Sequence, residues 1–140
     1  MTIPTRSTFH RVLIVDQSRD SREVLRTALA RRGVQTYETS HARTGLELAQ
    51  RYQPDVIVVD LEAFWPNQDA DASTVCRQFD SGSARHRASL VFLGEARGDN
   101  RPLPTARFIR KPYHYAPLIR TILECLQAKT PEASHASAPN

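Results

Sequence analysis

The sequence has no long hydrophobic run and no N-terminal targeting segment. None of the apolar runs in its 140 residues approaches the length of about eighteen that spans a bilayer. The first ten residues read MTIPTRSTFH and lack the apolar core of a secretory signal. We therefore expect no membrane partner, and the cytoplasm is the expected compartment.

Cysteines and nucleotide-binding loops are also scarce. The two cysteines, Cys76 and Cys125, do not have the CxxC spacing of a metal or redox site. In a cytosolic chain we expect both to be small core residues rather than a disulfide. There is no GxGxxG and no P-loop pattern, and the five histidines are scattered without an evident nucleophile beside them. The sequence is therefore not expected to encode an enzyme.

The chain carries a formal net charge of +4, and most of its basic residues are arginines. A basic domain can bind nucleic acid or an acidic partner. Here the arginines are spread along the whole chain, and no basic run is interleaved with aromatic residues. This distribution is typical of a solvated surface, so nucleic acid is not an expected partner.

Strand and helix patterns alternate over residues 10–128, between an expected loose arm (1–9) and an expected disordered polar tail (129–140). The alternation predicts an α/β domain with an open, doubly wound sheet of five parallel strands joined by right-handed crossovers. The expected strands are RVLIVD (11–16), VQTYETS at an edge (34–40), DVIVVD (55–60), SLVFLG (89–94) and ARFIRK (106–111). The expected helices lie within 18–33, 42–54, 73–79 and 115–127. In the first of them, one helical face carries the apolar residues Val24, Leu25, Ala28 and Leu29, and Gly33 stands where a C-terminal cap belongs.

The strands that matter for function end in chemically informative residues. In open α/β sheets, ligands bind outside the carboxyl ends of the strands. Asp16, Asp60, Gly94 and Lys111 are the last residues of four predicted strands, so we expect them to cluster. Nearby carboxylates repel each other, and an ammonium group or Mg²⁺ relieves that repulsion. A carboxylate can also accept a phosphoryl group as a nucleophile. One such acid could simply cap a helix, but the combination favours a site.

This arrangement resembles the receiver domain of two-component response regulators. The resemblance covers residues 10–128 and rests on LIVDQS, PDVIVVD and FIRKP. It implies a flavodoxin-like sheet in the order 2-1-3-4-5 and phosphorylation of Asp60 by a sensor histidine kinase or another signalling protein. It also implies that Mg²⁺ is held by Asp16, Asp60 and the backbone carbonyl of Glu62, and that Lys111 contacts the phosphoryl group.

Two further positions follow from the resemblance. Phe108 stands where the family has its switch aromatic, and the bond between Lys111 and Pro112 matches the family's cis peptide. Gln17 stands where the family has its second acid, so Mg²⁺ is expected to bind weakly. Gly94 stands where the family has Ser or Thr, so the readout of phosphorylation is expected to be weakened.

Two segments differ in length from the family. The stretch LEAFWPNQDADAS (61–73) contains an apparent insertion that places Phe64 and Trp65 beside the site. They either fold over the core or form a contact for a partner protein. The stretch GEARGDNRPLPTAR (94–107) is short and rich in helix-breaking residues, so the family's fourth helix is expected to be shortened or absent.

The leading hypothesis is an atypical receiver that acts by protein–protein interaction, with Asp60 as the phosphoacceptor. One alternative is a pseudo-receiver that binds its partner without phosphorylation, and a weaker one is a small nucleotide-binding enzyme on the same fold. A DNA-binding regulator is not expected, because little chain follows residue 128. A receiver excised from a longer protein stays open as an alternative, with the tail as a linker. The sequence predicts neither the cognate partner nor the oligomeric state.

Overall fold

The protein is an α/β structure built on one five-stranded parallel sheet. The computed structural model describes residues 9–62, 77–81, 87–94 and 106–128. The strand order is β2-β1-β3-β4-β5, which confirms the predicted order. The strands are β1 (Arg11–Val15), β2 (Gln35–Thr39), β3 (Val56–Asp60), β4 (Ser89–Gly94) and β5 (Arg107–Arg110).

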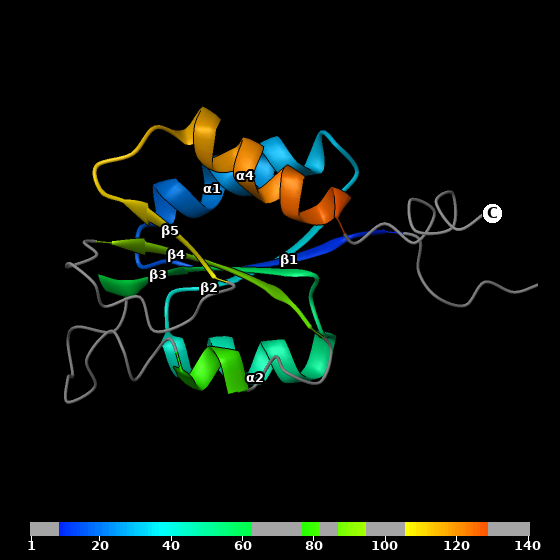
Figure 1. Cartoon of the computed structure of the whole chain (residues 1–140), viewed down its shortest axis with the longest axis vertical. Helices are drawn as coiled ribbons and strands as arrows, with labels where there is room; N and C mark the ends of the chain where they lie inside the picture. The colour runs from blue at the N-terminus through cyan, green and yellow to red at the C-terminus, as the bar shows by residue number, and fades with distance from the viewer. Residues whose placement is uncertain (1–8, 63–76, 82–86, 95–105, 129–140) are drawn as a thin grey trace, which may run out of the picture.

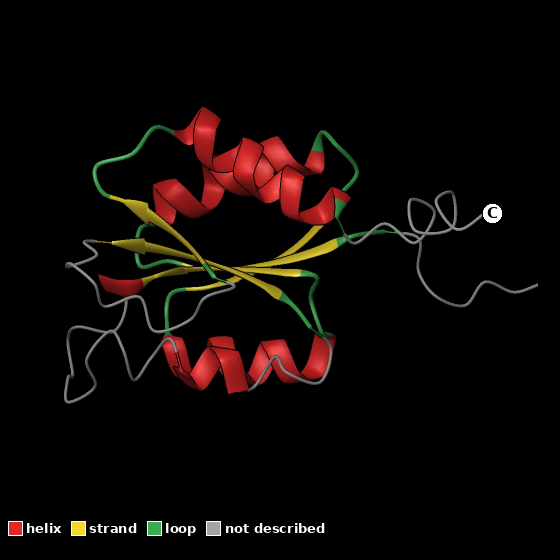
Figure 2. Ribbon diagram, viewed as in Figure 1, coloured by secondary structure: helices red, strands yellow, loops and turns green. Residues whose placement is uncertain are grey.

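Helices cover both faces of this sheet (Figure 1). The helix α1 (Arg19–Ala30) lies beside α4 (Tyr115–Gln127) on one face. The helix α2 (Ala42–Tyr52) lies on the other face together with the helical residues 77–81. Figure 2 shows the resulting three layers, with the sheet between two helical layers. The strands and three of the four predicted helices lie where the sequence placed them.

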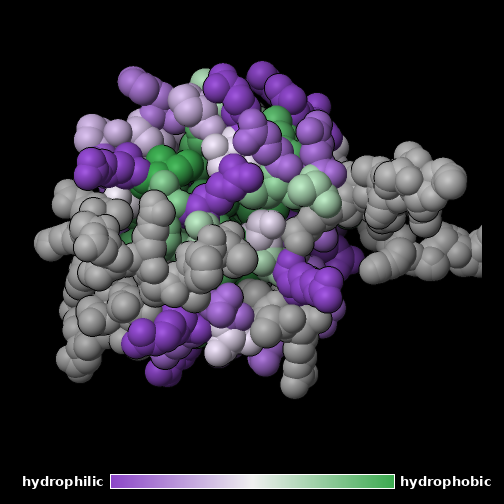
Figure 3. Space-filling model, viewed as in Figure 1, coloured by the Kyte–Doolittle hydropathy of each residue, from purple (hydrophilic) through white to green (hydrophobic). Residues whose placement is uncertain are grey.

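The central strand β1 is buried on both faces and divides the core in two. Val12 and Ile14 pack toward α1 and α4, whereas Leu13 and Val15 pack toward α2. This is the two-residue alternation of an extended strand. On the face seen in Figure 3, many of the described side chains are hydrophilic, and the residues of the two apolar layers are buried. A continuous apolar run was therefore the correct signal for a strand between two helical layers.

The helix α1 shows both a predicted end and a wrong prediction. Ser18 is the N-cap, and its side chain accepts a hydrogen bond of 3.2 Å from the backbone N–H of Ser21. Beyond the helix, Gly33 adopts a φ of +77°, a conformation that favours glycine. Leu25 is fully buried as predicted, but Val24 is 38% exposed. The prediction that Val24 shares the buried face is wrong, because α1 buries a narrower stripe than the sequence pattern suggested.

The helix α2 approaches the sheet closely at Gly45. A Cβ atom at this position would lie 2.7 Å from Cγ2 of Val15 in β1. The helix ends at Tyr52, and Gln53 then takes a left-handed conformation with φ of 47° before Pro54. Small size at the contact and proline at the end therefore fix where α2 lies.

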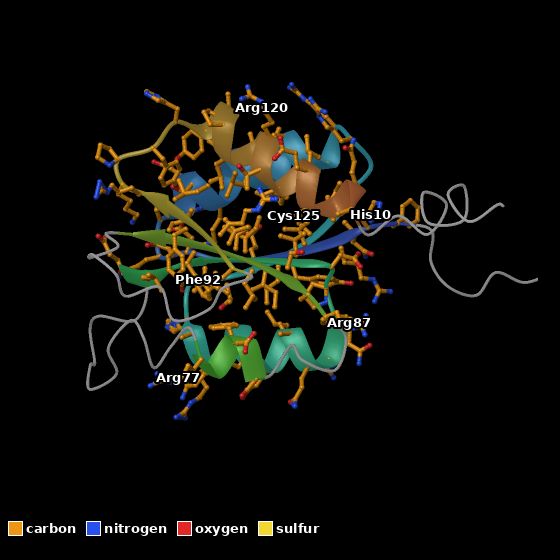
Figure 4. The ribbon with its side chains drawn as sticks, in the orientation of Figure 1. His10, Arg77, Arg87, Phe92, Arg120 and Cys125 are labelled. Carbon is orange, nitrogen blue, oxygen red and sulfur yellow. The ribbon has the colours of Figure 1, made fainter. Side chains whose placement is uncertain are left out.

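Several predictions fall on residues outside those that the structure describes. These are the shortened helix between β4 and β5, the Phe64–Trp65 segment, the N-terminal arm up to residue 8 and the tail, which all stay predictions. Cys125 is a free, buried cysteine between α4 and the sheet (Figure 4), whereas Cys76 also lies outside the described residues. Among the helices that the structure describes, none is both long and apolar enough to cross a membrane.

Candidate functional site

Three charged side chains come together at the carboxyl ends of the strands. Asp16 directly follows β1, Asp60 is the last residue of β3, and Lys111 directly follows β5. The strands β1 and β3 are neighbours in register, with Val15 paired to Val59, so the two acids stand one residue beyond paired positions. Both acids are buried. Parallel topology therefore gathers residues that are far apart in the sequence.

Lys111 forms an ion pair with Asp60. The Nζ atom lies 2.8 Å from Oδ1 of Asp60, and the two side chains are 26% and 6% exposed. The same oxygen accepts a hydrogen bond of 3.0 Å from the backbone N–H of Glu62. Lys111 Nζ also lies 3.3 Å from Oε1 of Glu62, whose side chain is 54% exposed. One ammonium group thus faces a buried carboxylate and a more exposed one.

Asp16 is held by the loop that follows it. Its backbone N–H donates to the carbonyl of Thr39 (3.0 Å), and its Oδ1 accepts from the backbone N–H of Ser18 (2.8 Å). The pKa of Asp16 is raised from 3.8 to about 7, chiefly by burial. Repulsion by Asp60 and hydrogen bonding with it contribute to the rise, whereas the Ser18 N–H and the charge of Lys111 oppose it. The two acids are therefore close enough to disfavour double ionisation.

The pKa values of Lys111 and Tyr113, which lie near the acids, are raised as well. Burial alone would lower the pKa of Lys111, but hydrogen bonding to Asp60 and the charges of Asp60 and Glu62 outweigh it and raise that pKa. Burial also raises the pKa of Tyr113, and the nearby charge of Asp16 adds to the effect. The ammonium form of Lys111 and the neutral form of Tyr113 are therefore favoured beside the acids.

The two predicted switch positions are packed differently from the acids. Gly94 ends β4, and a Cβ atom there would lie 3.3 Å from both Cβ and Cδ1 of Leu61. Leu61 is buried, so it fills the space beside Gly94 that a side chain would enter. Phe108 in β5 is partly buried, and its ring centroid lies 5.4 Å from that of Phe92. Phe92 lies on the α2 side of the sheet (Figure 4).

Gln17 directly follows the buried Asp16 but lies at the surface. Gln17 is exposed, and its backbone carbonyl accepts from Nη1 of Arg22 at 3.4 Å. The peptide bond between Lys111 and Pro112 is cis, as the resemblance implied.

Sequence reasoning missed three residues that shape this end of the sheet. They are Arg22, which bonds the loop after β1; Leu61, which packs against Gly94; and the side chain of Glu62, which contacts Lys111. Arg22 is the one with a sequence signal, because it lies in the first helical turns six residues after Asp16. The other two contacts depend on how strands pack and have no local signature.

The donor set fits a hard divalent cation. Asp16 and Asp60 supply adjacent buried carboxylates, and the pKa of Asp16 is raised by burial and by repulsion from Asp60, which a bound cation would offset. Mg²⁺ is often held by only one or two carboxylates, with water filling the remaining positions. Among the described residues, no three His, Cys, Asp or Glu side chains are grouped so that they could hold a metal ion. Within the described part of the chain, the buried carboxylates that the site offers to a cation are those of Asp16 and Asp60.

Comparison with known proteins places the fold but not a family. No family model matches the sequence, and no curated protein matches it. Among solved structures, a signal receiver domain from Vibrio parahaemolyticus matches with a TM-score of 0.70 at 14% identity, over 94% of this chain and 99% of that one. The chemotaxis protein CheY4 of Vibrio cholerae matches with a TM-score of 0.68 at 19% identity, over 84% and 99% of the two chains.

A third structure shares the fold with a different role. It represents a family of redox sensors in the streptococci that evolved from two-component response regulators, and it matches with a TM-score of 0.70 at 15% identity. The match covers 94% of this chain and 57% of that one. The predicted resemblance is thus confirmed at the level of fold: the chain has the receiver fold. Because one fold hosts different functions, the function has to be argued from the site.

Proposed function

We propose that this chain is a receiver module of a two-component signalling pathway, in which Asp60 accepts a phosphoryl group in the cytoplasm from a sensor histidine kinase or another signalling protein. The observation that carries the proposal is the ion pair of 2.8 Å between Lys111 Nζ and Asp60 Oδ1 beside a second buried acid, Asp16. The receiver fold supports the same function. The module then acts by contact with a partner protein rather than by turning over a substrate.

The proposed step is a phosphoryl transfer to a carboxylate. Oδ1 of Asp60 already accepts hydrogen bonds from Lys111 and from the Glu62 N–H, so we assign the attack to Oδ2. A bond forms between this oxygen and phosphorus, and the bond from phosphorus to the donor's nitrogen or oxygen breaks. The donor leaves with that electron pair and takes a proton from solvent. Lys111 Nζ stays beside Asp60 and offers hydrogen bonds to the phosphoryl oxygens.

The residues that would hold Mg²⁺ are Asp16, Asp60 and the backbone carbonyl of Glu62, with a weak contribution from Gln17. The ion, when bound, supplies positive charge that offsets the repulsion between the carboxylates and the incoming phosphoryl group. Asp60 and Asp16 carry −2, and Lys111 returns this to −1. The affinity for a dication is therefore expected to be weaker than in a site with three acids, which makes the module atypical.

A second candidate function is a pseudo-receiver that binds its partner without phosphorylation. It is favoured by the contact between Gly94 and Leu61, because Gly94 offers no hydroxyl to a phosphoryl group and Leu61 occupies the adjacent space. In this alternative Asp60 is not modified, and the partner binds the unmodified domain. The two candidates make different predictions for the same experiment.

The test is phosphorylation by a small donor. The protein is incubated with Mg²⁺ and acetyl phosphate and then analysed by intact mass. We expect one added phosphoryl group that is absent in Asp60→Asn. Asp20→Asn serves as the matched control, because it removes an exposed acid in the first turn of α1. Modification of wild type and Asp20→Asn alone supports the receiver, whereas an unmodified wild type would leave the pseudo-receiver.

A further inference from the structure

We propose that Arg22 is a positioning residue for the site, because its guanidinium fixes the loop of residues 16–18 so that the Asp16 carboxylate is held for metal binding. The inference rests on the proposed function and deepens it. Nothing in the spacing of the acids indicates such a role. It comes from the contacts that one side chain of α1 makes with the loop and with the edge strand β2.

Arg22 bonds three acceptors at once. Its Nη1 donates to the backbone carbonyl of Asp16 at 2.7 Å and, more weakly, to that of Gln17 at 3.4 Å. Its Nε donates to Oε1 of Glu38 at 3.0 Å. The Arg22 side chain is only 18% exposed and that of Glu38 25%. The guanidinium therefore links the loop after β1 to strand β2 in a partly buried setting, where its planar fork can bond both.

These bonds determine where the Asp16 side chain is held. A peptide unit is planar, so fixing a carbonyl also fixes the N–H of the next residue. The carbonyl of Gln17 shares its plane with the N–H of Ser18, which donates to Asp16 Oδ1 at 2.8 Å. Arg22 fixes the backbone carbonyl of Asp16, and the carbonyl of Thr39 fixes the backbone N–H of Asp16. The loop is thus held at both peptide units that carry the acid.

Glu38 holds Arg22 in this position. It lies in β2, directly opposite Ile14 of β1, and so has a fixed place beside the loop. Its second carboxylate oxygen pairs with Arg26, one turn further along α1. Arg26 is 45% exposed, and the bonds described for its side chain reach Glu38 but not the loop. The two arginines thus share one carboxylate, and Arg22 is the one that contacts the acid loop.

This difference makes Arg26 the matched control for Arg22. Arg22→Met and Arg26→Met each remove one cation from Glu38 while keeping much of the apolar stem. A merely structural role predicts similar losses of stability and no selective effect on the acid. The positioning role predicts weaker metal binding for Arg22→Met alone. Loss of a partner that orients a metal ligand typically weakens affinity about 10- to 100-fold.

The experiment is a Mg²⁺ titration followed by amide NMR of wild type and variants. We expect Arg22→Met to lower the affinity for Mg²⁺ about tenfold, which is the low end for loss of a partner that orients a metal ligand. We expect Arg26→Met to change the Mg²⁺ affinity less than about twofold. Arg22→Lys keeps the positive charge but lacks the planar guanidinium, so its Mg²⁺ affinity is expected to lie between those of the two methionine variants. If Arg22→Met does not fold, Arg22→Lys and Glu38→Gln carry the test. Equal Mg²⁺ affinities for the Arg22 and Arg26 variants would overturn the inference.

A second readout does not need the metal. In the absence of Mg²⁺, the amide resonance of Ser18 reports the bond to Asp16 Oδ1. It should shift strongly in the Arg22 variants and little in Arg26→Met. If wild type binds no Mg²⁺ but this pattern appears, the proposed function fails while the positioning role stands. If the Ser18 resonance is unchanged in every Arg22 variant, the positioning role is wrong whatever the metal does.

Discussion

The carboxyl end of the sheet has two groups of residues, one polar and charged and the other apolar. The acid half consists of Asp16, Asp60 and Lys111, which are buried or half-buried. Lys111 pairs with Asp60, and both groups interact electrostatically with Asp16. The readout half consists of Gly94, Leu61 and Phe108, a glycine packed by a leucine beside a partly buried aromatic. The acid half therefore contains buried polar groups, whereas the readout half is packed with apolar groups.

On the proposed function, accepting a phosphoryl group and responding to one would depend on different residues. A bound group shifts a conformational equilibrium only through interactions that differ between the two states. We propose that the acid half binds the group, whereas the readout half has no side-chain hydroxyl at Gly94 to sense it. We therefore expect modification at Asp60 to change the protein locally, with binding to its partner largely constitutive.

The largest expected effect concerns the charge balance of the acid half. The pKa of Asp16 is about 7 in the folded protein, against an ordinary value of 3.8. Between these values the folded state binds more protons than the unfolded state. The free energy of unfolding should therefore fall as pH rises through this window, by up to about 1.4 kcal/mol per pH unit. Urea denaturation across the window measures the slope.

Replacing the acid separates this cause from others. Asp16→Asn removes the titrating group, so the slope should flatten and the variant should be more stable than wild type above pH 7. Mg²⁺ should likewise stabilise wild type at the upper end of the window, because it binds the ionised pair. Asp20→Asn, at an exposed position, should leave the slope as it is. An unchanged slope in Asp16→Asn would show that burial and the neighbouring Asp60 do not raise the pKa of Asp16.

The acid half could be predicted from the sequence because its members stand at the ends of strands. An apolar run marks a strand, and parallel topology then places Asp16, Asp60 and Lys111 at one end of the sheet. The contact between Leu61 and Gly94 could not be predicted in the same way. It depends on how closely Leu61, just beyond β3, approaches the end of β4, and no sequence periodicity encodes that approach.

The same limit explains the errors at the surface. The 3.6-residue pattern identified α1 but could not show how wide a stripe of it is buried, so the exposure of Val24 was missed. The long reach of Arg22 to Glu38 joins residues sixteen positions apart, across a helix and a strand. Flexible charged side chains choose among several partners, and only the assembled structure decides which ones they meet.

An intermediate effect is expected from filling the readout half. Gly94→Ala adds a Cβ atom 3.3 Å from Cβ and Cδ1 of buried Leu61, and a Cβ atom cannot swing away. We expect the free energy of unfolding to fall by about 1 to 2 kcal/mol. The measurement is denaturant unfolding of four proteins: wild type, Gly94→Ala, Leu61→Ala and the double variant. The penalty of Gly94→Ala should largely disappear in the Leu61→Ala background. Equal penalties in both backgrounds would mean that Leu61 does not close this half.

The smallest expected effect comes from Glu62, whose carboxylate contacts Lys111 at 3.3 Å from outside the acid half. A phosphoryl group on Asp60 would compete with this carboxylate for the Lys111 ammonium and be repelled by its charge. Glu62→Gln should therefore tighten binding of a phosphoryl mimic such as trifluoroberyllate at saturating Mg²⁺. The same change should slightly lower the affinity for Mg²⁺, because it removes a negative charge near the acids.

Both effects should be small, because an ion pair with a partner that is 54% exposed is worth less than about 1 kcal/mol. We expect about two- to fivefold tighter binding of the mimic and about twofold weaker Mg²⁺, each measured by calorimetry. Glu47→Gln, an exposed acid on α2, is the matched control for net charge. Opposite signs for the two ligands are what distinguish Glu62 from a merely structural contact. If both affinities move in the same direction, or if Glu47→Gln has the same effects, the contact with Lys111 does not tune the acid half.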